Sequence, residues 1–201
     1  MTLTDIFNEE GGDKGSFFSH IDQTENLAHN YTIIYDEYMK EYRDKNIAML
    51  EIGLWCPYFP GASIRAWSRY FSTVQYYGID IVDCTKLSSE NVFIDIVDQR
   101  NENALNSYIK DKPMFKFIID DGCHEEDAIV ISLGNLFPQL ESGGIYFIED
   151  LHVVDKRNLL QLVTKTFTSE YISKDKLKYI NDNIRECRFS DDGKMCIIHK
   201  A

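Results

Sequence analysis

The sequence predicts an α/β fold, in which a mainly parallel sheet of seven strands carries helices on both faces. Apolar segments of strand length alternate with longer segments whose apolar residues recur every three or four positions. This alternation is typical of βαβ units, which build parallel sheets. The last two strand-like segments instead flank Asp191-Asp192-Gly193, a turn signal that predicts an antiparallel hairpin at the C-terminal end.

Seven strands and five helices are expected, in one domain. The strands are expected at residues 47–53, 74–81, 92–96, 115–119, 144–148, 184–190 and 194–199. The helices are expected at residues 22–43, 62–71, 102–110, 125–136 and 156–168. Because no linker rich in Pro, Gly or Ser divides the chain, we expect a single domain over residues 1–201. Its first part, 1–45, is predicted to be an arm and a helix, and 46–201 to be the core.

Tyrosines recur at helical spacing in the first predicted helix, for example at Tyr31, Tyr35, Tyr38 and Tyr42. Such a stripe is typical of a helix face that packs on the core. It could also stack against a flat aromatic ligand, and the sequence leaves both interpretations open.

Composition and charge exclude several classes of partner. The chain has 201 residues, with 21 Lys and Arg against 33 Asp and Glu, and a formal net charge of −12. Nucleic-acid binding needs a basic surface, and so does attraction to an anionic membrane, so we expect neither partner. No apolar run approaches the ~18 residues of a spanning helix, which predicts no membrane insertion. Five cysteines without a CxxC pair indicate a reducing, cytoplasmic compartment.

The first two predicted strands end in residues that suit a nucleotide-like ligand. Glu51 and Gly53 end the first strand, and Asp80 ends the second. Neither a GxGxxG fingerprint nor a Walker A motif is present. Asp80 could accept hydrogen bonds from ribose hydroxyls, and Glu51 could bind an ammonium group. Together they suit S-adenosylmethionine, although such residues also cap loops.

Acidic residues gather at the ends of two later strands. Asp120 and Asp121 follow the strand at 115–119, and Glu149 and Asp150 follow the strand at 144–148. Parallel strands bring these ends to one edge of the sheet, where the carboxylates would repel one another unless a cation compensates them. Oxygen ligands suit Mg²⁺ or Mn²⁺. The alternative is that these acids cap helix N-termini.

His124 lies three residues beyond Asp121. Its ordinary pKa near ~6.5 lets it take a proton at neutral pH, so it could be a general base beside a metal. It could equally cap a helix or support a ligand. Cys123 has no base arranged to activate it, and we expect it to be a packing residue.

Eight segments, in the same order, connect the chain with a known family. They are Asp13-Lys14-Gly15-Ser16, HNYTIIY at 29–35, LEIG at 50–53, PGASIRAWSRYF at 60–71, YGIDI at 77–81, VDQ at 97–99, FIIDDGCH at 117–124 and LFPQLESGGIYFIEDLH at 136–152. In these segments the chain resembles the metal-dependent class I S-adenosylmethionine O-methyltransferases that act on sugars. The family includes enzymes that methylate rhamnosyl and other deoxyhexose groups of antibiotics. The resemblance implies a Rossmann-like fold and methyl transfer to a sugar hydroxyl.

The resemblance also implies a role for each matching residue. It implies that Asp121, Glu149 and Asp150 hold Mg²⁺ or Mn²⁺, and that His124 is the base that removes the hydroxyl proton, with Asp121 also counted as catalytic. The residues implied to bind S-adenosylmethionine are Lys14 and Gly15 from the arm, Glu51, Gly53 and Ser63 for the methionine part, Asp80 for the ribose, Asp98 and Gln99 near the adenine, and Asp120.

Two departures from the family pattern stand out. Residues 17–28 separate the DKG and HxY elements, which lie close together in the family, and Cys123 replaces a serine. The first departure leaves the role of the arm open. The expected partners are a sugar or glycan acceptor and either a second copy of the chain or the rest of a larger glycan-assembly protein.

Other functions remain as alternatives. A catechol-type O-methyltransferase would use the same cofactor and metal on a flat phenol. A non-catalytic cofactor-binding module would keep the fold but transfer no methyl group. A hydroxylase would need a redox cofactor, and the sequence shows no His-rich iron site.

Overall fold

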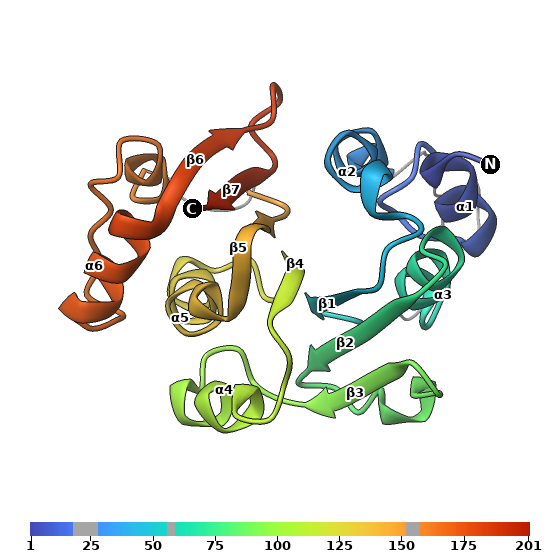
Figure 1. The fold of residues 1–201 in the computed structure, drawn as a ribbon, viewed down its shortest axis with the longest axis horizontal. Helices are drawn as coiled ribbons and strands as arrows, with labels where there is room; N and C mark the ends of the chain where they lie inside the picture. Colours follow the sequence, from blue (N-terminus) through green and yellow to red (C-terminus); the bar gives the residue numbers. More distant parts are fainter. Residues whose placement is uncertain (18–27, 56–58, 152–156) are drawn as a thin grey trace.

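A single mixed sheet of seven strands organises the protein (Figure 1), in the order β3-β2-β1-β4-β5-β7-β6. The computed structural model describes residues 1–17, 28–55, 59–151 and 157–201. The strands are β1 (Ile47–Ile52), β2 (Val74–Asp80), β3 (Val92–Ile96), β4 (Phe115–Asp120), β5 (Leu140–Ile148), β6 (Ile184–Phe189) and β7 (Cys196–Lys200). β1 to β5 pair in parallel, and β7 pairs antiparallel with both β5 and β6. The predicted α/β class, strand number and terminal hairpin are confirmed.

Six α-helices are described. They are α1 (Leu3–Glu10), α2 (Tyr31–Met39), α3 (Ala62–Tyr70), α4 (Glu102–Ile109), α5 (Glu126–Leu136) and α6 (Lys174–Asn183). Short 3-10 helices lie at Lys40–Tyr42, Thr85–Leu87, Phe137–Gln139 and Leu159–Leu162. All the described helices are too short or too polar to cross a bilayer.

The sheet separates two apolar cores, because neighbouring residues of a strand point to opposite faces. In β1, Met49 packs with residues of α1, α2 and α3, whereas Leu50 packs with residues of α4, α5 and α6. Figure 1 shows these two groups of helices on opposite sides of the sheet. Tyr31 and Tyr35 of α2 are buried in the first core, as a core-facing stripe predicts.

The register brings the carboxyl ends of the central strands together. Ile52 of β1 pairs with Asp120 of β4, and Asp120 pairs with Ile148 of β5. The residues that follow these positions, Gly53, Asp121 and Glu149, therefore leave the sheet at one level. This edge carries the candidate site.

The structure corrects several predicted elements. The arm contains α1, whose Thr2 and Asp5 form a capping box and whose apolar side packs on α3. Helix α2 begins only at Tyr31, and residues 22–27 of the predicted helix lie outside the described residues. The helix predicted over 156–168 is wrong for its described part, which holds only the 3-10 turn Leu159–Leu162, and α6 was not predicted. β5 begins four residues early, at Leu140.

Candidate functional site

Gly53 is where the loop after β1 passes closest to the loop after β4. Its φ of +84° lies in the left-handed region, and a Cβ there would stand 2.0 Å from the carbonyl oxygen of Asp121. Only glycine meets both conditions without strain. The backbone hydrogen bonds from Gly53 N to Ile79 O and from Asp121 N to Ile52 O, both 2.9 Å, hold the two loops in place.

A pocket of about 400 Å³ opens at this edge of the sheet, within the size range of small-molecule sites. Its walls come from the arm and from the loops that follow β1 to β5. The sequence-predicted residues that line it are Lys14, Gly53, Ser63, Asp80, Asp98, Gln99, Asp121, His124 and Asp150. The other predicted residues, Gly15, Glu51, Asp120 and Glu149, are not among its lining residues and are buried behind it.

Asp80 shapes the loop after β1. Its Oδ2 accepts the backbone N–H groups of Leu54 (2.6 Å) and Trp55 (2.9 Å), and its Oδ1 accepts that of Val82 (2.8 Å). Asp98 similarly accepts the N–H of Arg100. The loop-capping interpretation of such residues is therefore observed, and both side chains still line the pocket.

Gln99 connects two loops from beneath the pocket. Its amide donates to Asp120 Oδ1 at 3.1 Å, and its carbonyl oxygen accepts the N–H of Cys123 at 2.7 Å. Asp120 also accepts from the hydroxyls of Ser132 and Tyr146. Burial raises the pKa of Asp120 to about 6, against the opposing effect of these hydrogen bonds. Gln99 and Asp120 thus brace the loop that carries Asp121.

Lys14 places an ammonium group among three carboxylates. Its Nζ lies 2.9 Å from Glu149 Oε2 and 3.6 Å from Glu51 Oε1, and it donates a hydrogen bond to Asp121 Oδ2. Only 2% of Lys14 is exposed. Burial would lower its pKa, but the three carboxylates raise it well above the ordinary value, so the group stays charged. Lys14 was expected to close over the cofactor, which stays a prediction; in the structure its ammonium group lies in the acidic cluster.

The carboxylates around Lys14 are crowded. Burial, together with the nearby charges of Asp13 and Asp150, raises the pKa of Asp121 to about 7 even though Lys14 opposes this. Burial and the charge of Asp121 likewise raise the pKa of Glu149 well above its usual value. Such crowding favours the arrival of further positive charge.

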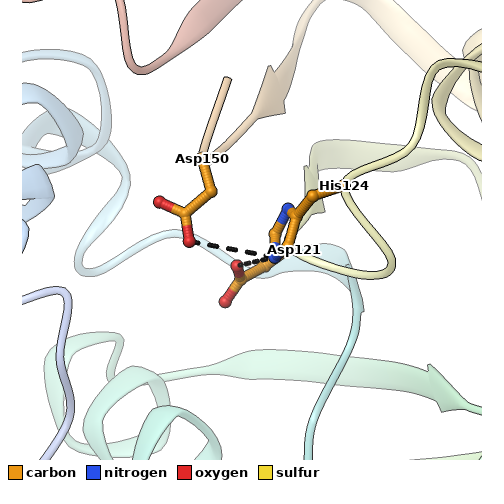
Figure 2. Close-up of side chains that lie close together, drawn as sticks. All are labelled: Asp121, His124 and Asp150. Atoms are coloured by element: carbon orange, nitrogen blue, oxygen red, sulfur yellow. Dashed lines mark ion pairs between the residues drawn. The ribbon is translucent and has the colours of Figure 1, made fainter. Parts of the chain in front are cut away.

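Asp121, His124 and Asp150 converge at the edge of the pocket (Figure 2). The Nε2 atom of His124 lies 3.8 Å from Asp121 Oδ1 and 3.8 Å from Asp150 Oδ2. One ligand atom from each residue lies within 4.8 Å of the others. His124 and Asp150 also have positive φ values, of 53° and 55°. Two carboxylates and an imidazole around one point fit a divalent cation in the chemistry of their donors.

Glu149, the third ligand implied by the family resemblance, is engaged elsewhere. Its Oε2 pairs with Lys14 and its Oε1 accepts the hydroxyl of Tyr35. Glu149 is 1% exposed and is not part of the cluster around His124. The structure therefore brings Asp121 and Asp150 together with His124, and sets Glu149 behind them.

The tyrosines and the histidine that contact these acids were not predicted from the sequence. Tyr31 donates to Asp150, Tyr35 donates to Glu149, and Tyr76 donates to Glu51. His29 Nδ1 lies 3.1 Å from Asp150 Oδ1. The spacing of Tyr31 and Tyr35, four residues apart on one helix face, was the available signal, because it presents both hydroxyls to the same neighbour.

Comparison with curated proteins gives matches of one kind. The chain is 33% identical over 126 residues to 8-demethyl-8-alpha-L-rhamnosyl tetracenomycin-C 2'-O-methyltransferase of Streptomyces olivaceus. The matched residues make up 61% of this chain and 33% of that protein. The same identity over the same length relates it to demethylmacrocin O-methyltransferase of Streptomyces fradiae, covering 61% of this chain and 32% of that one. The chain is therefore similar to sugar O-methyltransferases of antibiotic pathways. The expected resemblance to these sugar O-methyltransferases is confirmed, and the chain spans about a third of the length of the curated relatives it matches.

Solved structures agree on the fold. MycE methyltransferase from the mycinamycin pathway, in complex with Mg and SAH, superposes with a TM-score of 0.79 at 22% identity, over 100% of this chain and 55% of that one. The predicted class I methyltransferase, Rossmann-like fold is therefore confirmed. No family model matches the chain.

Proposed function

We propose that the protein is an S-adenosylmethionine-dependent, divalent-metal-dependent O-methyltransferase. Its acceptor is a sugar hydroxyl, of rhamnose or another deoxyhexose in a glycan or glycoside. One observation carries the proposal: a pocket of about 400 Å³ at the carboxyl ends of the strands has Asp121, His124 and Asp150 at its edge. Two curated relatives, whose names specify a rhamnosyl and an olivosyl compound as the methylated molecule, support the choice of acceptor.

The pocket suits the cofactor in three ways. Gly53 lets the loop after β1 pass against the backbone of Asp121, and both residues line the pocket. Asp80 and Asp98 line the pocket, and their carboxylates can accept from hydroxyl or amino groups. Glu51 stays our proposed partner for the ammonium group; its Oε1 has no hydrogen-bond partner among the described residues, although Lys14 Nζ lies 3.6 Å away and Glu51 does not line the pocket. When bound, S-adenosylmethionine would supply a methyl group on a sulfonium sulfur, which leaves as a neutral thioether.

Asp121 and Asp150 are our proposed ligands for Mg²⁺ or Mn²⁺, with Glu149 as the third. A bound divalent cation would supply charge that lowers the pKa of a nearby hydroxyl. Their oxygens offer the hard donors that these ions prefer. Glu149 would have to exchange its contact with Lys14 to serve as a direct ligand.

His124 is our proposed general base. It lies beside both aspartates and lines the pocket, and about a quarter of the side chain is exposed, so an acceptor hydroxyl can reach it. The neighbouring carboxylates stabilise the imidazolium that forms when the ring takes a proton. The pocket orients the attacking oxygen towards the methyl group, and this positioning contributes much of the rate enhancement.

A methyl-transfer screen tests the proposal. The protein is incubated with S-adenosylmethionine and either a panel of rhamnosides or a catechol, with Mg²⁺ or with excess EDTA, and the products are read by mass and NMR. We expect rhamnoside methylation that needs Mg²⁺ and is lost in His124→Gln, while calorimetry still shows cofactor binding. Methylation of the catechol alone favours the catechol-type alternative. Cofactor binding with no transfer to any acceptor favours a non-catalytic module.

The proposed partners are a sugar or glycan acceptor and, because the chain covers a third of its relatives, further protein segments or subunits. A homo-oligomer or a larger glycan-assembly protein stays a prediction, as does a cytoplasmic location.

A further inference from the structure

The two carboxylate oxygens of Asp150 lie next to different residues in the described part of the chain. Its Oδ1 accepts the hydroxyl of Tyr31 at 2.5 Å and lies 3.1 Å from His29 Nδ1. Its Oδ2 lies 3.8 Å from His124 Nε2. The two oxygens of one carboxylate thus have different neighbours, and the carboxylate plane is fixed by groups outside the Asp121, His124 and Asp150 cluster.

The two residues that contact Oδ1, His29 and Tyr31, belong to a segment that backbone hydrogen bonds join to the N-terminal arm. His29 N donates to Asp13 O (2.7 Å), Asn30 N donates to Gly15 O (2.9 Å), and Thr32 N donates to Lys14 O (3.0 Å). Asn30 takes a left-handed conformation just before α2 begins. Tyr31 is 1% exposed and its ring meets that of His29 edge to face, with 5.2 Å between centroids. These backbone and ring contacts restrain both side chains.

The backbone at Asp150 needs such support. Its φ of 55° is a conformation that costs a non-glycine residue about 1–3 kcal/mol. Hydrogen bonds of Glu149 N to Asp120 O and of Leu151 N to Lys194 O fix the backbone on either side of it. The backbone conformation sets the position of the Asp150 side chain, and the contacts with Tyr31 and His29 set the rotation of its carboxylate.

We propose that Tyr31 and His29 are positioning residues of the metal site. They hold Asp150 by Oδ1, so that Oδ2 is presented next to Asp121 and His124. This inference rests on the metal in the proposed function and adds two residues to which no role was assigned. It also gives the HxY element of the sequence a purpose, because its first and third residues contact the same oxygen.

Binding of Mn²⁺ alone, followed by electron paramagnetic resonance without cofactor or acceptor, tests the inference. Groups that orient a metal ligand typically contribute 10–100-fold to metal affinity. We expect Tyr31→Phe to raise the Kd for Mn²⁺ by about 10-fold or more, with one ion still bound per chain. His29→Leu should raise the Kd as well, and His29→Asn, which keeps a donor near the Nδ1 position, should restore part of the affinity.

Tyr42→Phe is the matched control, because the Tyr42 ring packs against Phe117 and lies near Lys45 and Lys116. Its Kd should equal that of the wild type. A variant that is merely unstable would bind less Mn²⁺ in total at an unchanged Kd, and this result for Tyr31→Phe would overturn the inference. So would a wild-type Kd in Tyr31→Phe, while the proposed function stands. If the wild type binds no Mn²⁺, the proposed metal fails and the inference fails with it.

Discussion

Lys14→Met is the substitution that most directly tests the electrostatics of the acidic cluster. Methionine keeps the length of the apolar stem but removes the ammonium group. Lys14 is 2% exposed and lies within 4 Å of Glu51, Asp121 and Glu149. In the variant these carboxylates lose the cation that lies among them, and burial keeps water from replacing it.

The magnitude follows from the burial of the ion pairs. Removing one partner of a buried pair costs about 3–5 kcal/mol, because the other charge stays desolvated. For a domain of this size each kcal/mol lowers Tm by about 2–4 °C. We therefore expect Lys14→Met to unfold about 6–20 °C below the wild type at pH 8.

The loss should depend on pH. The pKa of Asp121 is about 7 in the folded protein, above its ordinary value, and that of Glu149 is raised too. A carboxyl whose folded pKa is raised contributes stability below that pKa, and the contribution is lost as pH rises through it. Removing the Lys14 ammonium group raises the pKa values of Asp121 and Glu149 further, because Lys14 lowers both. At pH 5.5 the carboxyls are protonated in the folded variant, so its deficit in Tm should be smaller than at pH 8.

Thermal unfolding followed by circular dichroism at pH 5.5 and 8, with EDTA present, measures both effects. Lys174→Met is the control, because Lys174 is exposed at the start of α6. Its Tm should stay within about 2 °C of the wild type, the usual range for surface changes of ~0.5 kcal/mol. The reasoning is refuted if Lys14→Met loses no more than the control, or loses the same amount at both pH values.

Three further outcomes are expected. Mg²⁺ should raise Tm more at pH 8 than at pH 5.5, because it needs the carboxylates of Asp121 and Glu149 ionised; an equal gain in a melting scan contradicts this. Gly53→Ala should lower the free energy of unfolding in urea more than Gly143→Ala does, since both glycines have positive φ but only Gly53 abuts a backbone oxygen. Equal losses of free energy would mean that backbone strain alone is the cause. Gln99→Leu should weaken S-adenosylmethionine binding several-fold in calorimetry, because the loop below the pocket loses two hydrogen bonds; unchanged affinity would make Gln99 irrelevant there.

The sheet could be predicted because its strands carry strong local signals. β1 and β4 are buried along their whole length and appear in the sequence as apolar runs, and such runs between helices indicate a parallel sheet. Helix α6 has no comparable apolar run, and the local signal of α1 is limited to the capping box of Thr2 and Asp5. Ile180 is the buried residue of α6, and α1 depends on packing against α3. Such elements are stabilised by tertiary contacts, which local periodicity does not reveal.

The site was predictable in its residue types and its location, but not in its pairings. That Asp121, His124 and Asp150 meet follows from the rule that ligands bind at the carboxyl ends of parallel strands. The partner of Lys14 could not be predicted, because Lys14 and Asp121 are 107 positions apart. The same holds for Asp80, where the sequence left ribose binding and loop capping open and the structure shows the capping bonds.

The pairings connect the N-terminal segment to the candidate site. Glu149 and Asp150 are consecutive, and each accepts a hydroxyl from α2, Tyr35 for Glu149 and Tyr31 for Asp150. Two tyrosines one helical turn apart can reach two consecutive carboxylates because the left-handed conformation of Asp150 turns the chain between them. The predicted boundary near residue 45 therefore lies between secondary-structure elements, but residues on both sides of it contribute to the candidate site. A site assembled in this way loses the orientation of its acids when the N-terminal segment is removed, even if the sheet remains folded.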